Sequence, residues 1–177
     1  GRIKARQIER DLREYKSDVP LYLKAILMNN LACFYFIDGD LDSSLKNINS
    51  ILNETNLVIR KDIIEFAKLF QLLIHYELKN YDLLEYLIPS VMKYLKSKIK
   101  NYTKTREKIL IEFFTEAVKT DEQGQKELIN QLQFRLKKSG IKASGEGTEY
   151  FDYILWCESK INNIPLSEAI KTKHQRQ

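Results

Sequence analysis

The sequence predicts an all-α fold in which about eight helices pack as antiparallel pairs, with no sheet. Apolar residues recur at helical spacing through most of the 177 residues. A tight turn at Asp38-Gly39-Asp40 separates two such patterns. A similar turn follows 40 residues later, where Lys79-Asn80-Tyr81 aligns with Gly39-Asp40-Leu41. A repeated unit of this kind cannot bury its apolar face alone, so we expect neighbouring pairs to stack.

The first half of the chain contains five predicted helices, over residues 2–16, 20–37, 41–52, 60–78 and from the Lys79–Asp82 turn to about Lys100. The second and fourth are apolar nearly all round, which predicts packing on more than one side. The third carries a narrow apolar stripe, so it has a solvated face, and Asp40 is its expected N-cap. In the fifth, the apolar pattern continues in phase across Pro89, which predicts a kink rather than an end.

Three further helices are predicted in the second half, over residues 103–119, from Thr120 onward, and over 148–162. Thr120 and Gln123 have the spacing of a capping box at the start of the middle one. The segment 139–147 is rich in glycine and is expected to be a flexible loop. Pro165 is expected to open a short final turn.

One predicted helix pair, over residues 25–58, carries a distinctive arrangement of small and bulky residues. Its first helix has Leu31-Ala32 and Tyr35, its turn has Gly39, and its second helix has a small Ser44 followed by Ile48. This unit resembles a tetratricopeptide repeat. Residues 65–98 form a weaker unit, because Lys79 stands in place of the glycine and Leu84 in place of the small residue.

The resemblance implies a short right-handed α-solenoid that forms a single domain over residues 1–177. Residues 99–177 would then add further helices, with the helix over 148–162 as an end cap. It also implies binding of a protein or peptide, as a scaffold or regulatory segment of a longer chain, rather than catalysis. The alternative is an irregular helical bundle in which one tight turn happens to look like part of a repeat.

In tetratricopeptide repeats the first helix of each unit lines a concave groove. The residues at the matching positions here are Asn29, Cys33, Phe36, Phe66, Leu69 and Tyr76. We expect the aromatic members to anchor a protein or peptide partner and Asn29 to orient it. The alternative interpretation assigns the same residues to the core, and the apolar character of both helices favours it.

A basic segment over residues 93–108 is the basis of an alternative function, nucleic-acid binding. At 100° per residue Lys93, Lys96, Lys100 and Lys104 fall on one side of the helix. The chain has a formal net charge of +5, so phosphate contacts are plausible where the charge is concentrated. No aromatic stacking platform or known binding motif accompanies these lysines, which favours a solvated face instead.

Catalytic, metal-binding and membrane-spanning functions are not expected. His75 and His174 lack ligands at metal-binding spacing, and no cofactor motif follows a strand. Asp38, Asp40 and Asp42 alternate as in a calcium loop but lack its glycine and its bidentate glutamate. Two cysteines within apolar patterns favour a reducing, cytoplasmic setting. A purely architectural or dimerising domain, a homo-oligomer, is the third interpretation.

Overall fold

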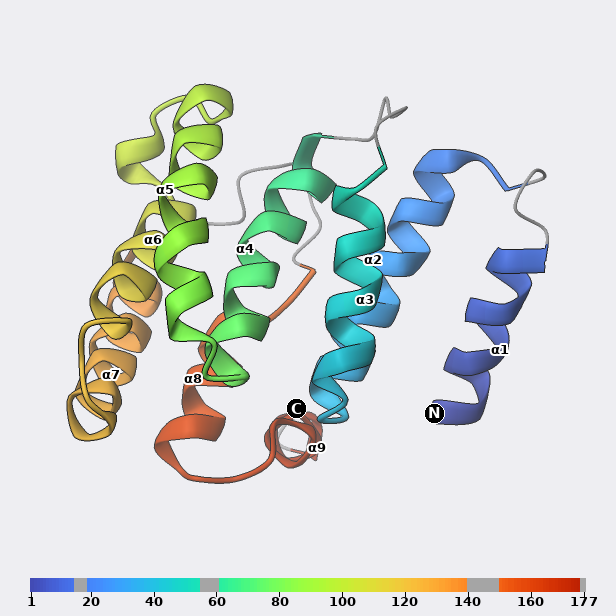
Figure 1. Ribbon diagram of the computed structural model, residues 1–177. Helices are drawn as coiled ribbons and strands as arrows, with labels where there is room; N and C mark the ends of the chain where they lie inside the picture. Colours follow the sequence, from blue (N-terminus) through green and yellow to red (C-terminus); the bar gives the residue numbers. More distant parts are fainter. Residues whose placement is uncertain (15–18, 55–60, 140–149, 176–177) are drawn as a thin grey trace. The chain divides into compact units, whose positions relative to one another are not determined.

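The computed structural model describes residues 1–14, 19–54, 61–139 and 150–175. Within these ranges the chain forms nine α-helices and one short 3-10 helix, with no strand (Figure 1). This confirms the predicted all-α class. The chain divides into two compact units, residues 1–71 and 72–177, and helix α4 (Lys61–Glu77) contributes residues to both.

In the first unit, α1 (Arg2–Glu14) packs on α2 (Leu21–Ile37) through a small apolar contact. Ala5 and Leu12 are its buried side chains, and they pack with Leu31 and Tyr35 of α2. The remaining described side chains of α1 are mainly exposed, as expected for a one-sided amphipathic helix. The Arg2 guanidinium also pairs with the carboxylate of Asp38.

Helices α2 and α3 (Leu41–Leu52) form a closely packed antiparallel pair. Ser44 is fully buried, and its hydroxyl donates to the carbonyl of Ala32 at 2.8 Å. A small residue on each helix allows this approach, as the sequence predicted. The Asp40 carboxylate accepts from the backbone N–H of Ser43 at 3.0 Å, which confirms Asp40 as the N-cap.

The part of α4 in the first unit packs through aromatic rings. Phe66 and Phe70 stack with ring centroids 5.0 Å apart, and Phe70 lies 5.1 Å from Phe36 of α2. The Gln71 side chain donates to Asn49 Oδ1 of α3 at 2.8 Å. These contacts explain why α2 and α4 are apolar nearly all round, since each packs against more than one neighbour.

The second unit continues with helices that pack in order along the chain. They are α5 (Tyr81–Lys98), the 3-10 helix η1 (Tyr102–Lys104), α6 (Arg106–Ala117), α7 (Glu122–Ser139), α8 (Tyr153–Ile161) and α9 (Leu166–Gln175). An aromatic cluster lies at the centre of this unit. Tyr76, Phe113 and Trp156 come from three helices, and their ring centroids are 5.3 to 6.0 Å apart.

The same turn geometry occurs at three places in the described residues. At residues 38–40, 78–80 and 162–164 the first backbone N–H bonds four residues back, the second three back and the third five back. The middle residue of each turn is left-handed, with φ of 83° at Gly39, 58° at Lys79 and 52° at Asn163. The repeat at a 40-residue offset therefore extends to the backbone hydrogen bonds, although Lys79 has replaced the glycine.

Several predicted boundaries need correction. Asp121, and not Thr120, caps α7, because its carboxylate accepts from the N–H of Gly124 at 2.8 Å. The Thr120 hydroxyl instead donates to the carbonyl of Glu116. The expected final turn after Pro165 is a ten-residue helix, α9. The predicted helix over 148–162 begins only at Tyr153, while 140–147 of the predicted loop lie outside the described residues.

Candidate binding surfaces

The six residues expected to line a groove are all buried. They have exposed fractions of 0 to 8%, and they are Asn29, Cys33, Phe36, Phe66, Leu69 and Tyr76. Burial is consistent with the core interpretation, because these side chains pack between helices of their own units. Their role in partner binding stays a prediction and would require these helices to separate.

The environment of these residues is strongly apolar. Burial raises the pKa of the Cys33 thiol to about 12, so the reactive thiolate is suppressed. Burial also raises the pKa of Tyr76, whose hydroxyl donates to Gln125 Oε1 at 3.1 Å. Asn29 is fully buried, and neither atom of its side-chain amide has a hydrogen-bond partner in the described part of the chain.

An open groove lies elsewhere in the first unit, between α1, α2 and α3. Its volume is about 950 Å³, which lies within the usual range of ligand sites. Leu12, Met28 and Leu45, one from each helix, contribute the apolar part of its lining. The other lining residues are polar: Glu9, Lys24, Asp42, Lys46, Asn47, Asn49, Ser50, Asn53 and Glu54.

The polar wall of this groove follows the solvated face of α3. Asp42, Lys46, Asn49 and Asn53 recur at intervals of four, three and four residues, so they form a row along the helix. Lys24 and Lys46 form no ion pair with any described residue, and the same holds for Asp42. The row thus offers both charges and side-chain amides to a bound molecule. A solvated face was predicted for this helix, but only the fold places α1 opposite it.

The wall formed by α1 is held by the apolar contact of Ala5 and Leu12 with α2 and by a polar contact with α3. Asn47 of α3 donates to Glu9 Oε1 at 2.8 Å. Burial of the Tyr35 ring raises the pKa of its hydroxyl, as do the charge of Glu9 and a hydrogen bond with it. The groove is therefore bounded by a helix that buries few apolar side chains.

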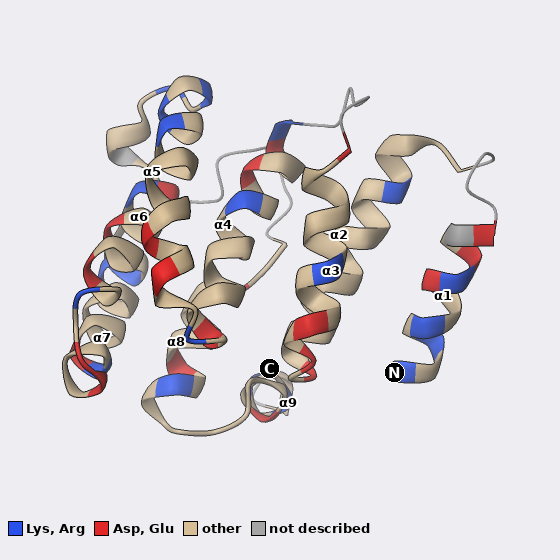
Figure 2. Ribbon diagram, viewed as in Figure 1, with Lys and Arg blue, Asp and Glu red and all other residues tan. Residues whose placement is uncertain are grey.

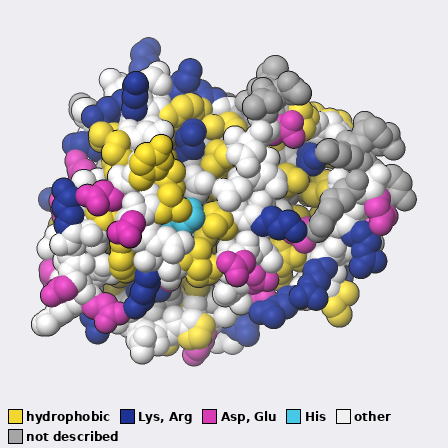
Figure 3. Space-filling view, viewed as in Figure 1, with side chains coloured by type: hydrophobic (Ala, Val, Ile, Leu, Met, Phe, Trp, Pro, Cys, Tyr) yellow, Lys and Arg dark blue, Asp and Glu magenta, His cyan; other side chains and the backbone are white. Residues whose placement is uncertain are grey.

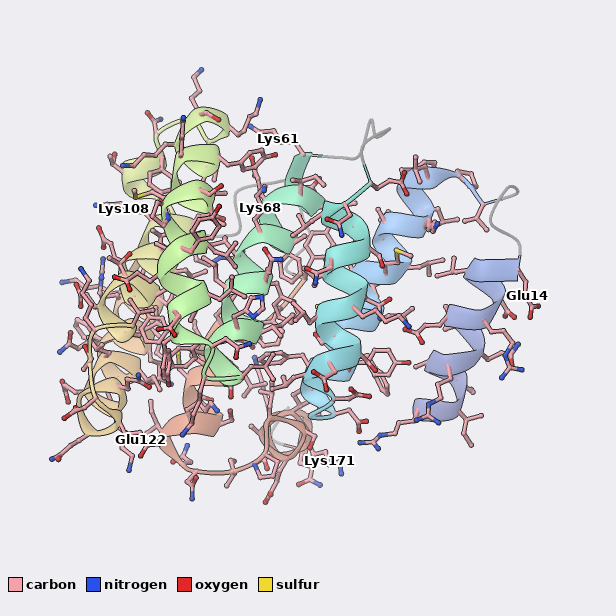
Figure 4. All side chains as sticks on the ribbon, in the orientation of Figure 1. Glu14, Lys61, Lys68, Lys108, Glu122 and Lys171 are labelled. Atoms are coloured by element: carbon pink, nitrogen blue, oxygen red, sulfur yellow. The ribbon has the colours of Figure 1, made fainter. Side chains whose placement is uncertain are left out.

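A second depression, of about 830 Å³, lies in the second unit between α4, α5, α7 and the α8–α9 turn. Here the polar groups bond to one another. Gln125 Oε1 accepts from both Tyr76 and Tyr81, at 3.1 and 3.3 Å, and its Nε2 donates to the carbonyls of Ala117 and Thr120. On the rim, Glu122, which Figure 4 labels, pairs with Lys79 at 2.7 Å. This satisfied network stabilises the helix ends and leaves few groups for a ligand.

The lysines of the alternative nucleic-acid site lie at the C-terminal half of α5 and just beyond it. Lys93, Lys96 and Lys100 are exposed and form no ion pair with a described residue. The side chain of Lys104 lies outside the described residues. Tyr86, which the sequence analysis did not single out, is 78% exposed on the same helix. An aromatic group therefore does accompany these lysines.

No cluster of three or more His, Cys, Asp or Glu residues with metal-binding geometry occurs in the described ranges. None of the described helices is both long and apolar enough to cross a membrane. Comparison with known proteins yields no matching family model, curated protein or solved structure.

Proposed function

We propose that this protein is a non-enzymatic interaction or scaffold domain whose first unit binds an extended segment of a partner protein in the α1–α2–α3 groove. The observation that carries the proposal is the row of polar side chains along α3, which faces an apolar lining inside an open groove. Asparagine amides both donate and accept, so they can pair with the N–H and C=O groups of an extended chain. Lys24 and Lys46 would pair with acidic side chains in that chain, and Asp42 with basic ones.

We further propose that the helix pairs are degenerate tetratricopeptide repeats. The close contact between Ser44 and Ala32 supports this assignment, as does the left-handed glycine in the α2–α3 turn. The second pair keeps the turn geometry without its glycine. In this family, stacked pairs serve mainly to present a surface to other proteins, which agrees with a binding role.

Nucleic-acid binding through the α5 lysines is a weaker candidate. Tyr86 supplies a stacking surface, but Asp82 and Glu85 are exposed on the same helix within four residues of it. Carboxylates at this position repel the phosphates that the lysines would attract. We therefore assign the interaction role to the groove of the first unit.

Selection from a library of random peptides displayed on phage tests the proposal. We expect the wild-type protein to enrich peptides that carry both acidic and basic residues, and Ser50→Trp to abolish enrichment because the indole fills the groove. Gln131→Trp, at an exposed site on α7, is the matched control and should enrich the same peptides. Equal enrichment by Ser50→Trp, or none by the wild type, would contradict the proposal.

A further inference from the structure

A single stripe of exposed residues runs along α5 and separates charges by sign. Its members are Asp82, Glu85, Pro89, Lys93 and Lys96, all of them exposed. At 100° per residue they lie within about 80° of the helix circumference. Figure 2 shows the acidic residues toward the N-terminal end of α5 and the basic residues toward its C-terminal end.

The spacing of these charges is symmetric about Pro89. Asp82 lies seven residues before it and Lys96 seven residues after it, while Glu85 and Lys93 lie four residues before and after. These offsets correspond to about 10 Å and 6 Å along the helix. In a second copy that runs antiparallel and is centred on the same proline, each carboxylate therefore lies at the same position along the helix axis as a lysine of the first copy. The stripe is complementary to an antiparallel copy of itself.

The four charges are also unpaired. No described residue forms an ion pair with Asp82, Glu85, Lys93 or Lys96. Several charges of α6 to α8 do form ion pairs. Lys108, which Figure 4 labels, bonds to Glu112 at 3.1 Å, and Lys137 bonds to Glu158 at the same distance.

An exposed aromatic residue borders the charged stripe. Tyr86 is 78% exposed and lies about 60° around the helix from Pro89. In Figure 3 apolar side chains gather over α5, with acidic side chains below them and basic ones above. Exposed aromatic residues are enriched in protein interfaces, where tyrosine is a frequent anchor.

We propose that two copies of this protein associate through α5 in an antiparallel, two-fold arrangement centred near Pro89. The interface is isologous, so Asp82 of one copy faces Lys96 of the other and Glu85 faces Lys93, each pair occurring twice. Tyr86 adds apolar contact beside the ion pairs. Exposed ion pairs contribute little individually and are screened by salt, so the dimer should be weak and sensitive to ionic strength.

Charge reversal in the full chain provides the test. Sedimentation at rising protein concentration and low salt should show the wild-type mass approaching twice that of the monomer, with loss of this shift at high salt. Asp82→Lys with Glu85→Lys should keep the protein monomeric, because all four facing pairs become repulsive. Lys93→Glu with Lys96→Glu should have the same effect. An equimolar mixture of the two variants should recover the doubled mass, since each now complements the other.

A control variant and a nucleic-acid binding assay distinguish this dimer interface from other uses of the α5 stripe. Glu168→Lys with Lys171→Glu, an exposed charge reversal on α9, is the control and should leave the wild-type association intact. A wild-type protein that stays monomeric at every concentration overturns the proposal, as does a mixture of the α5 variants that fails to associate. Binding of single-stranded oligonucleotides that is lost in Lys93→Glu with Lys96→Glu, without self-association, would assign the stripe to nucleic acid instead.

Discussion

Asn29 occupies a fully buried site in α2 where its side-chain amide has no hydrogen-bond partner among the described residues. A buried polar group without a partner loses its hydration and gains nothing in return. Leucine has a similar shape and no polar atoms. We expect Asn29→Leu to raise the free energy of unfolding by about 1–2 kcal/mol, measured by urea denaturation.

The neighbouring Asn30 is exposed and provides the control, because Asn30→Leu should leave stability nearly unchanged. A loss of stability in Asn29→Leu would show that the amide holds a partner, such as a bound molecule. In that case the sequence-based assignment of Asn29 to a binding site would regain support.

The stability of the second unit depends on pH through His75. Burial lowers its pKa below the ordinary value, and the Asn80 side-chain nitrogen lies 3.3 Å from Nδ1. The folded protein thus holds this imidazole neutral more strongly than the unfolded chain does. This contribution to stability is present above the unfolded pKa of about 6.5 and is lost as pH falls through the folded value.

Unfolding by urea at pH 7.5 and pH 5.5 measures this effect. We expect the wild-type protein to lose more stability than His75→Gln between these values, because glutamine does not titrate. An equal loss in both proteins would show that His75 is not responsible for the pH dependence.

At the scale of single elements, the α2–α3 turn depends on its left-handed glycine. Gly39 has φ of 83°, and a Cβ at this position would meet no atom within 4 Å. A side chain at this position would therefore destabilise the turn only through the left-handed backbone conformation that it must adopt. We expect Gly39→Ala to lower the free energy of unfolding by about 1–2 kcal/mol.

Asparagine tolerates the left-handed region better than alanine does, so Gly39→Asn should cost less. The comparison of the two variants by thermal denaturation separates backbone strain from steric effects. Equal stability of Gly39→Ala and the wild type would mean that the turn relaxes to another conformation.

Most of the helices could be predicted from the sequence because burial follows the spacing of apolar residues. The turn at Gly39 was equally accessible, since glycine marks a left-handed position. The turn at Lys79 was predicted from its alignment with Gly39 at a 40-residue offset. The turn at Asn163 has the same geometry without glycine and was recognised only from its hydrogen bonds and its left-handed φ. The cap of α7 was assigned one residue early, because Thr120 and Asp121 both have side-chain oxygens suited to capping.

At the scale of the whole molecule, surface chemistry was less predictable than burial. Ion pairs such as Glu77 with Lys160 join helices that are distant in sequence, so composition alone does not reveal which charges remain unpaired. The groove of the first unit could not be predicted for the same reason, because α1 and α3 are separated in sequence and only the fold brings them together. Burial of the six predicted binding residues followed instead from a pattern the sequence did contain, two helices that are apolar all round.

In the proposed binding mode a partner segment lies along α3 in the first unit. Backbone amide chemical shifts, recorded while a selected peptide is titrated into the full chain, locate the bound peptide directly. We expect the largest changes at Met28, Lys46, Asn49 and Asn53, with little change on α5 and α7. Changes centred on the second unit, or none at saturating peptide, would contradict it.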